Sequence, residues 1–422
     1  MKVLILSYFF PPSNFVGGER TYAWSKYLSN DDIYPIIITR QWNDNQMDIT
    51  SKVFNNQLEI EKTNKAEIHR LPYRQSLRDK LSLFPKLFIA QKALTFFELV
   101  FSNFYIGFLP YSNFYKHATK VLEKNPDIEA VIASGRPFQS FFIGYLLKKK
   151  FPHIHWIPDY RDEWNSHQQS NPSNFLSKFI KVLETKSERK WTSNATFFLS
   201  VSDYWVSSIS KFINKEGITI KNGFEKTTYS YTQKTNPNKL VISYIGSLYE
   251  YQEIDTTIDA VKSLIRNNQY DIHFFFIGLN MMEDQEKRVS YLTRGYENNF
   301  TILPRMKKNE LIEYYEKSDL LLVTAFKGVK GWYPVKLFEY YQTATPILLC
   351  PSDKGDMENF VLSTNCGYVA DTKDGCIGLL NELFTRKRNG LAINTDKKQE
   401  VGEQFSRQYQ TQLLAKTLLA LK

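Results

Sequence analysis

The sequence predicts an α/β protein built from two doubly wound parallel sheets that face each other across a cleft. Short, continuously apolar runs alternate with helical stretches along most of the 422 residues. This alternation is typical of parallel sheets that are covered on both faces. A polar, turn-rich segment, KTTYSYTQKTNPNK at 226–239, interrupts the alternation and divides the chain into two series of similar size.

The first series opens with a strand at 2–7, a loop that contains Gly17 and Gly18, a helix at about 21–28, and an apolar strand at 35–39. The same β–loop–α–β pattern predicts later strands within 130–134, 153–160 and 195–203. Ligands of such sheets bind beyond the carboxyl ends of the strands. The loops that follow these strands are therefore the first places to look for a site.

The second series has the same alternation. It consists of the strands LVISYIGSL, HFFFIGL, DLLLVTA and GYVAD and of helical stretches such as DTTIDAVKSLIR and NELIEYYEK. We expect an N-terminal domain over 1–228 and a C-terminal domain over 229–402. Periodicity alone assigns the final helical stretch, 403–422, to neither domain, and a return to the N-terminal domain is one option.

Composition limits the class of protein. Hydrophobic residues make up 42% and aromatic residues 15%, and the three cysteines have no C-x-x-C spacing, which suits a reducing, cytoplasmic compartment. The apolar N-terminus is typical of a buried first strand rather than of a signal peptide. The net charge of +10 indicates anionic partners or simple solubility with equal weight. The charge is spread along the chain, so nucleic acid is not an expected partner.

The segment 70–115 differs in character from the rest. Residues 70–92 hold six basic side chains and one acid, and an aromatic, apolar stretch follows that is too polar for a transmembrane span. This pattern is typical of contact with an anionic membrane surface. A buried helix pair with basic residues on its outer face explains it as well.

Two glycine-bearing loops follow first strands. Gly17 and Gly18 allow close approach of a ligand to the backbone, and the next helix offers free N–H groups to an anion. Gly246 and Ser247 occupy the matching position in the second series, where we expect contact with a diphosphate. An ordinary strand-to-helix turn explains either loop equally well.

The stretch IPDYRDEW places Asp159, Arg161 and Asp162 just after a strand. Charged side chains at the end of an apolar strand usually face a cleft, because burying them unpaired costs several kcal/mol. We expect these residues in the catalytic region. An internal Arg–Asp pair that fixes the loop is the alternative.

The stretch GWYPVKLFEYYQTATPILLC predicts a short helix, which Pro334 begins and Thr345-Pro346 ends. Lys336 and Glu339 are i, i+3 neighbours on one face of it. A lysine near a helix N-terminus favours a phosphate, and the carboxylate can accept hydrogen bonds from a ribose diol. A solvated ion pair, worth only a few tenths of a kcal/mol, is the alternative.

Taken in order along the chain, these stretches resemble the GT-B-fold glycosyltransferases, in particular the large retaining group called family 4. The resemblance is carried by PPSNFVGGERTYAWSKYL, ASGRPFQS, IPDYRDEW, SVSDYW, IKNGFE, ISYIGSLYE and, most specifically, VKLFEYYQTATPILL.

The resemblance implies transfer of a hexose-type sugar from a nucleotide-diphosphate donor, with retention of configuration, no metal and no cofactor besides the donor itself. It implies that Glu339 binds the donor ribose, that Lys336 lies near the diphosphate, and that Arg305 and Met306 line the nucleobase. The sequence departs from the family pattern at Gly331, where the family often has a second glutamate. It also departs at Ser247 and Gln252, which replace a diphosphate-binding Arg and Lys, and at Arg161, which replaces a histidine.

The resemblance thus predicts a glycosyltransferase that acts on a glycan or lipid-linked acceptor, in bacterial surface polysaccharide assembly at the inner face of the plasma membrane. Two alternatives stay open. One is a nucleotide-sugar epimerase, and the other is a catalytically weakened nucleotide-sugar-binding protein.

Overall fold

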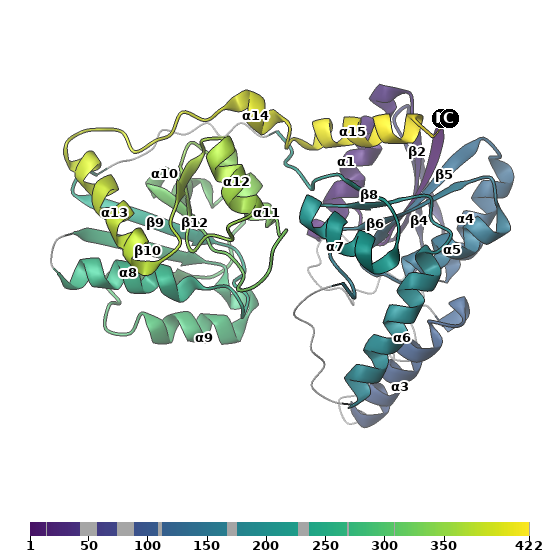
Figure 1. Cartoon of the computed structure of the whole chain (residues 1–422), viewed down its shortest axis with the longest axis horizontal. Helices are drawn as coiled ribbons and strands as arrows, with labels where there is room; N and C mark the ends of the chain where they lie inside the picture. The colour runs from purple at the N-terminus through teal and green to yellow at the C-terminus, as the bar shows by residue number, and fades with distance from the viewer. Residues whose placement is uncertain are drawn as a thin grey trace. The chain divides into compact units, whose positions relative to one another are not determined.

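Two predominantly parallel sheets organise the chain, one in each of two units (Figure 1). The computed structural model describes residues 1–13, 15–42, 57–73, 88–108, 112–166, 175–226, 236–267, 270–307 and 309–421. Unit 1 comprises Met1–Asn222 together with Arg407–Lys422, and unit 2 comprises Gly223–Ser406. The predicted fold class, an α/β protein with two Rossmann-like domains, is confirmed.

The sheet of unit 1 has the strand order β3-β4-β2-β1-β5-β6-β7-β8. Every neighbouring pair is parallel except β3 and β4. The strands are β1 (Lys2–Ser7), β2 (Tyr34–Arg40), β3 (Glu59–Lys62), β4 (Glu67–Leu71), β5 (Ile128–Gly135), β6 (His155–Tyr160), β7 (Phe198–Ser200) and β8 (Gly217–Thr219). The central strands are buried almost throughout, which is why they read as continuous apolar runs.

The α-helices of unit 1 within the described residues are α1 (Glu19–Tyr27), α3 (Phe88–Phe101), α4 (Asn113–Lys124), α5 (Ser140–Lys150), α6 (Phe175–Thr192), α7 (Asp203–Ile213) and α15 (Arg407–Leu419). Helix α15, at the far end of the sequence, packs Leu414, Ala415 and Leu418 into the same core cluster as Val3 and Trp24. The last helix is therefore part of the core of unit 1.

The sheet of unit 2 has the order β11-β10-β9-β12-β13-β14, and all its neighbouring pairs are parallel. Its strands are β9 (Lys239–Ile245), β10 (Asp271–Ile277), β11 (Phe300–Leu303), β12 (Leu320–Val323), β13 (Ile347–Leu349) and β14 (Gly367–Val369). The winding direction reverses between β9 and β12. This pair is the topological switch point, where ligands of open parallel sheets bind.

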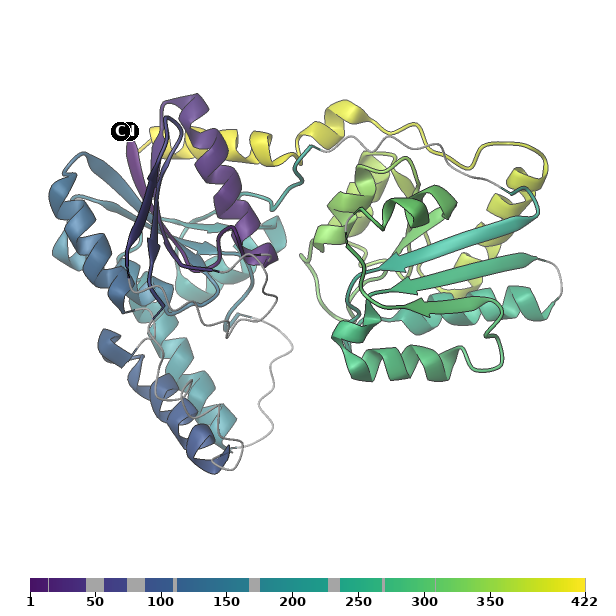
Figure 2. The same ribbon diagram turned by 180° about the vertical axis from the view of Figure 1, so that it is seen from behind.

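Helices lie on both faces of the second sheet (Figure 2), and two apolar clusters pack them against it. The helices are α8 (Ile254–Arg266), α9 (Glu283–Leu292), α10 (Ile312–Lys317), α11 (Val335–Tyr341), α12 (Asp356–Ser363), α13 (Lys373–Arg388) and α14 (Gln399–Glu403). One cluster contains Leu240 and Ile258, and the other contains Leu337 and Phe338 of α11. Helix α11 is thereby fixed against the sheet at its switch point.

The predicted membrane-contacting segment 70–115 lies partly outside the described residues. Its described part comprises the end of β4, helix α3, a 3-10 turn at Ile106–Phe108 and the start of α4. Within the part of the chain that the structure describes, every helix is too short or too polar to cross a bilayer.

Candidate active site

Three strand ends of unit 2 come together at the carboxyl edge of its sheet. Gly246 follows β9 with φ +107°, and Gly278 follows β10 with φ +92°, conformations that favour glycine. A Cβ atom placed on Gly278 would lie 3.6 Å from the Gly246 Cα atom and 3.8 Å from the Arg305 Cα atom. The two glycines therefore leave an edge of bare backbone that a ligand can approach closely.

Lys336 extends from α11 over this edge. Its Nζ atom lies 3.7 Å from the centroid of the Tyr244 ring and donates a hydrogen bond of 3.3 Å to the Ser247 carbonyl oxygen. A Cβ atom on Gly246 would lie 3.6 Å from the same Nζ atom. The structure thus brings together three residues that the sequence predicted as donor-binding, namely Gly246, Ser247 and Lys336.

Burial perturbs the ammonium group of Lys336. Loss of hydration lowers the pKa of Lys336 to about 7, and the negative charge of Glu339 opposes this effect only in part. A cation that its surroundings solvate poorly gains more from an incoming anion than a fully hydrated one. The aromatic face of Tyr244 is a weak partner compared with a diphosphate.

Two buried tyrosines fix the geometry around Lys336. The Tyr340 hydroxyl accepts a hydrogen bond from the Ile245 amide at 2.8 Å and donates to the Ile245 carbonyl at 3.2 Å, which joins α11 to the end of β9. The Tyr244 hydroxyl donates to the Ser247 carbonyl at 2.8 Å. Gln252 in turn joins this loop to β12, because its Nε2 donates to the Thr324 carbonyl at 3.2 Å.

Glu339 lies on the same short helix as Lys336 and is partly buried. Pro334 occupies the N-cap position of this helix with φ −67°. Gly331, where the family often has a second glutamate, is buried and has φ +79°. A side chain there would strain the backbone, so this turn is built for glycine.

The predicted nucleobase-lining pair lies after β11. The Arg305 side chain is exposed, and its backbone N–H donates to Asn280 Oδ1 at 2.9 Å. Met306 is partly buried and packs against an apolar cluster of unit 2. Gly278 joins β10 to the end of β11, because its backbone N–H donates to the Leu303 carbonyl at 2.9 Å.

In unit 1 the side chain of Arg161 packs against the glycine loop at Gly17. A Cβ atom on Gly17 would overlap the Arg161 guanidinium group. Arg161 Nε donates to the Gly135 carbonyl, Nη2 donates to the Arg136 carbonyl at 3.1 Å, and the guanidinium carbon lies 5.9 Å from the centroid of the Phe9 ring. Burial lowers the pKa of Arg161. Because Gly17 has no side chain, the Arg161 guanidinium group can lie directly over the glycine loop.

Asp159 and Asp162 have different environments. Asp159 is fully buried, where its Oδ1 accepts from Arg20 Nη2 at 3.0 Å and its Oδ2 accepts from Ser134 Oγ at 2.8 Å. Asp162 is more exposed and lies 3.6 Å from Arg136 Nε. Asp159 therefore fixes the ends of neighbouring strands through its contacts with Arg20 and Ser134. Asp162, in contrast, is accessible to solvent.

Sequence reasoning missed several residues at these edges. Tyr244 was interpreted only as part of an apolar strand, and Gly278 was not singled out although HFFFIGL repeats the strand-then-glycine pattern of YIGSL. In unit 1, the Phe9 ring stacks on Trp42 with centroids 5.4 Å apart and lies 5.2 Å from Phe15. Nothing in their spacing indicated this aromatic cluster beside the glycine loop.

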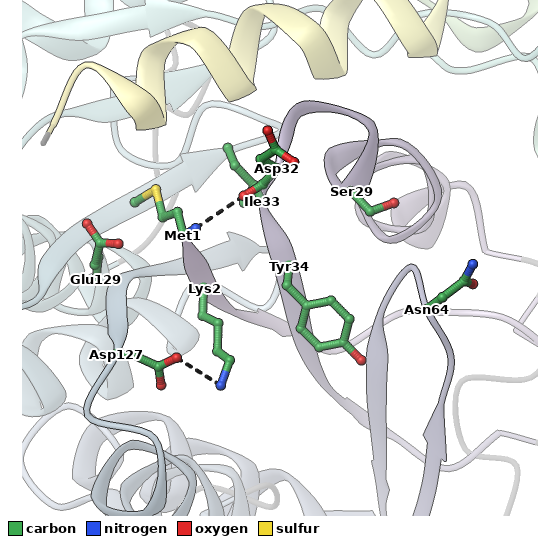
Figure 3. A pocket seen from close by; sticks show the side chains of 9 residues that line it. All are labelled: Met1, Lys2, Ser29, Asp32, Ile33, Tyr34, Asn64, Asp127 and Glu129. Carbon is green, nitrogen blue, oxygen red and sulfur yellow. Dashed lines mark hydrogen bonds and ion pairs between the residues drawn. The ribbon is translucent and has the colours of Figure 1, made fainter.

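Another hollow of unit 1, of about 450 Å³, lies at the opposite, amino-terminal edge of its sheet (Figure 3). Its two cations already have partners: Lys2 forms an ion pair of 2.9 Å with Asp127, and the Met1 amino group donates to the Asp32 carbonyl at 3.1 Å. This hollow lies away from the strand ends where parallel sheets bind ligands.

Comparison with known proteins agrees with this geometry. Residues 225–388 match the sequence model of the family described as glycosyl transferases group 1. None of the curated proteins compared with the chain matches its sequence.

Solved structures resemble the chain over its whole length. Sucrose-phosphate synthase from Thermosynechococcus elongatus is 13% identical with a TM-score of 0.64, and both chains are covered completely. Anabaena HepE in complex with UDP and glucose is 13% identical with a TM-score of 0.59, again with complete coverage of both chains. The lipopolysaccharide outer core galactosyltransferase WaaB in its apo form is 13% identical with a TM-score of 0.57 and the same coverage. The chain therefore has the GT-B fold, and its residues 225–388 match the sequence model of the glycosyl transferases group 1 family.

Proposed function

We propose that the protein is a glycosyltransferase that moves a hexose from a nucleotide-diphosphate donor to a glycan or lipid-linked acceptor with retention of configuration. The observation that carries this proposal is Lys336, a poorly hydrated cation that lies at the switch point of unit 2 beside the bare backbone of Gly246. A diphosphate is the anion that fits a lysine, a glycine edge and an adjacent carboxylate for the ribose.

In the proposed reaction, unit 2 holds the nucleotide. Lys336 and the backbone N–H groups near Gly246 stabilise the negative charge that develops on the leaving diphosphate. Glu339 accepts hydrogen bonds from the ribose diol, and the loop at Arg305 and Met306 contacts the base. The charge stabilisation needs no metal ion, because a protonated lysine and backbone dipoles supply it.

Unit 1 supplies the acceptor side. Arg161, held over the Gly17 loop, and Asp162 orient the acceptor hydroxyl, while Asp159 positions the strand ends beneath them. The hydroxyl attacks the donor sugar on the face that the diphosphate leaves, and the departing phosphate takes its proton. The new glycosidic bond then has the configuration of the donor.

The surrounding biology is proposed from the comparisons. HepE forms complexes with UDP and glucose and with UDP-glucose, and WaaB is a lipopolysaccharide outer core galactosyltransferase. These relatives support a UDP-hexose donor and a role in bacterial surface polysaccharide assembly. The protein then works in the cytoplasm, peripherally at the inner face of the plasma membrane, where a lipid-linked acceptor is presented.

A ligand screen followed by product analysis tests the proposal. We expect UDP or another nucleoside diphosphate to raise the melting temperature, because a bound ligand stabilises the folded state. At a ligand concentration of 100 times Kd, the free energy of unfolding rises by about 2.7 kcal/mol. Radiolabelled UDP-hexose then yields a labelled acceptor when incubated with bacterial glycolipid fractions. Label that stays on an epimerised nucleotide sugar, or nucleotide binding with no turnover on any acceptor, contradicts the transferase assignment.

A further inference from the structure

Eight large apolar side chains of unit 1 are exposed on two segments. One segment is α3 with the turn that follows it, and the other is the N-terminal half of α6. Both views show these two helices beside each other, extending away from the sheet (Figures 1 and 2). We name this region the arm surface; it consists of Phe97, Phe101, Phe104, Tyr105, Phe175, Leu176, Phe179 and Val182.

Several aromatic rings of the arm surface are mostly exposed to solvent. Phe175 is 86% exposed and Phe104 is 65% exposed. Single exposed apolar residues are common, but a gathered set of aromatic side chains marks an interaction site. The buried residues of α6 all belong to its C-terminal half, from Ser187 to Thr192, so this half anchors the helix and the other half has no core to cover.

The charges of α6 indicate the kind of partner. Exposed cations accompany the apolar residues and continue along the helix: Lys178, Lys186, Arg189 and Lys190. Both of its acids are withdrawn from solvent. Glu188 is fully buried, where it accepts from the Tyr160 hydroxyl at 2.9 Å and from Asn165 Nδ2 at 2.7 Å, and Glu184 is partly buried. The helix therefore presents apolar rings and positive charge together.

We propose that the arm surface docks onto an anionic phospholipid bilayer. The phenylalanine and tyrosine rings enter the boundary between headgroups and acyl chains, and the lysines contact the acidic headgroups. This inference deepens the membrane part of the proposed function. It adds the N-terminal half of α6, which the sequence did not indicate, to the segment 70–115, and it gives the contact a defined set of anchoring side chains.

Vesicle flotation of the full-length protein tests the docking. We expect the protein to float with vesicles of phosphatidylcholine and phosphatidylglycerol and to stay in solution with phosphatidylcholine alone. The triple variant Phe175→Ser, Leu176→Ser, Phe179→Ser loses flotation, whereas the control Tyr291→Ser, which removes an exposed ring of unit 2, floats like the parent. Lys178→Ala and Lys186→Ala each weaken vesicle binding by about fivefold, while Lys149→Ala on α5 leaves it unchanged.

Two outcomes overturn the inference. One is flotation that is absent in the parent or survives in the triple variant. The other is a parent that sediments as a dimer, with the triple variant monomeric and vesicle binding unaffected, because the arm surface is then an interface between two copies. The melting-temperature shift with UDP is measured on every variant. Flotation without any UDP shift defeats the donor proposal alone, and a UDP shift without flotation defeats the docking alone.

Discussion

Lys336 Nζ lies 3.7 Å from the centroid of the Tyr244 ring, so the cation at the switch point of unit 2 rests on an aromatic face. Tyr244 belongs to the first strand of the unit and Lys336 to a helix 92 residues later. Their contact holds the ammonium group beside the glycine edge before any ligand arrives. Preorganised charge of this kind does not have to be reoriented when the diphosphate leaves.

Replacing Lys336 by Met removes the charge and keeps most of the side-chain volume. A hydrogen bond to a charged group is worth about 1.5–3 kcal/mol, so we expect Kd for UDP to rise by about tenfold or more. Isothermal titration calorimetry measures this change. The control Lys287→Met, on α9, leaves Kd unchanged, and an unaltered Kd in Lys336→Met removes this lysine from the donor site.

The binding of UDP-glucose is expected to weaken as pH rises above about 7. The pKa of Lys336 is lowered to about 7 in the free protein, and a bound diphosphate favours the protonated form. Above this pH the free protein must take up a proton to bind, so Kd rises by up to about tenfold per pH unit. The variant Lys336→Arg stays charged and loses this dependence. The same slope in both proteins contradicts the assignment.

Glu339 is expected to select ribonucleotides. A carboxylate that accepts hydrogen bonds from the ribose diol loses a partner when a hydroxyl is missing, which costs about 1–3 kcal/mol at a buried site. We therefore expect the parent to bind UDP more tightly than 2′-deoxy-UDP or 3′-deoxy-UDP. The variant Glu339→Ala binds all three alike. If the preference for UDP persists in that variant, another group contacts the ribose.

The two glycines of the first loop are expected to respond differently to alanine. In Gly17→Ala the new methyl group displaces the flexible Arg161 guanidinium, so sugar transfer falls while the melting temperature and UDP binding change little. In Gly18→Ala the methyl group meets the Phe10 backbone at 2.9 Å, which has little freedom to move, so stability falls. Equal losses of stability in both variants would show that Arg161 cannot move aside.

The histidine pair of unit 1 is expected to make stability depend on pH. His117 Nε2 lies 2.6 Å from His69 Nδ1, and burial, with His69 and nearby lysines, lowers the pKa of His117 to about 4. The unfolded chain protonates this imidazole near its ordinary value, so the unfolded state binds more protons between about pH 6.5 and 4. The contribution of His117 to the free energy of unfolding is therefore fully present above about pH 6.5 and is lost as pH falls towards 4.

We expect a loss of about 1–2 kcal/mol across this window, after allowance for the partial exposure of His117. Urea unfolding at pH 7 and pH 4.5 measures it. The variant His117→Gln flattens the pH profile relative to the control His153→Gln. An identical profile in both variants assigns the acid sensitivity to other groups.

The fold could be predicted from the sequence because both sheets are predominantly parallel and their central strands are buried on both faces. Strands such as β1 and β9 are continuous apolar runs, and the loops after them are marked by glycine. The prediction of an α/β protein with two Rossmann-like domains rested on this pattern and is confirmed. Helix α15 resisted assignment because its buried positions include Gln410 and Thr411 as well as leucines, so no apolar face repeats along it.

The site was predictable where one residue type dictates a role. Lys336 at the start of a helix and Gly246 at the end of a strand were singled out, and the structure brings them together. Tyr244 could not be predicted as a partner of Lys336, since an inward-facing tyrosine in a strand looks like core. Asp159 was predicted in the catalytic region because it lies at the end of an apolar strand. Its ion pair with Arg20 could not be predicted, because the two residues are 139 positions apart and local sequence carries no trace of the contact.

The return of the chain to unit 1 makes unit 2 an insertion. The chain crosses from unit 1 to unit 2 and back at adjacent points, where the Phe224 amide donates to the Phe405 carbonyl at 3.0 Å. Unit 2 can therefore be excised as one continuous piece. A stop codon after Asn222, in contrast, would strip Leu414 and Leu418 from the core of unit 1. A fragment that represents unit 1 should therefore join residues 1–222 to residues 407–422, so that helix α15 stays with the sheet that contains β1.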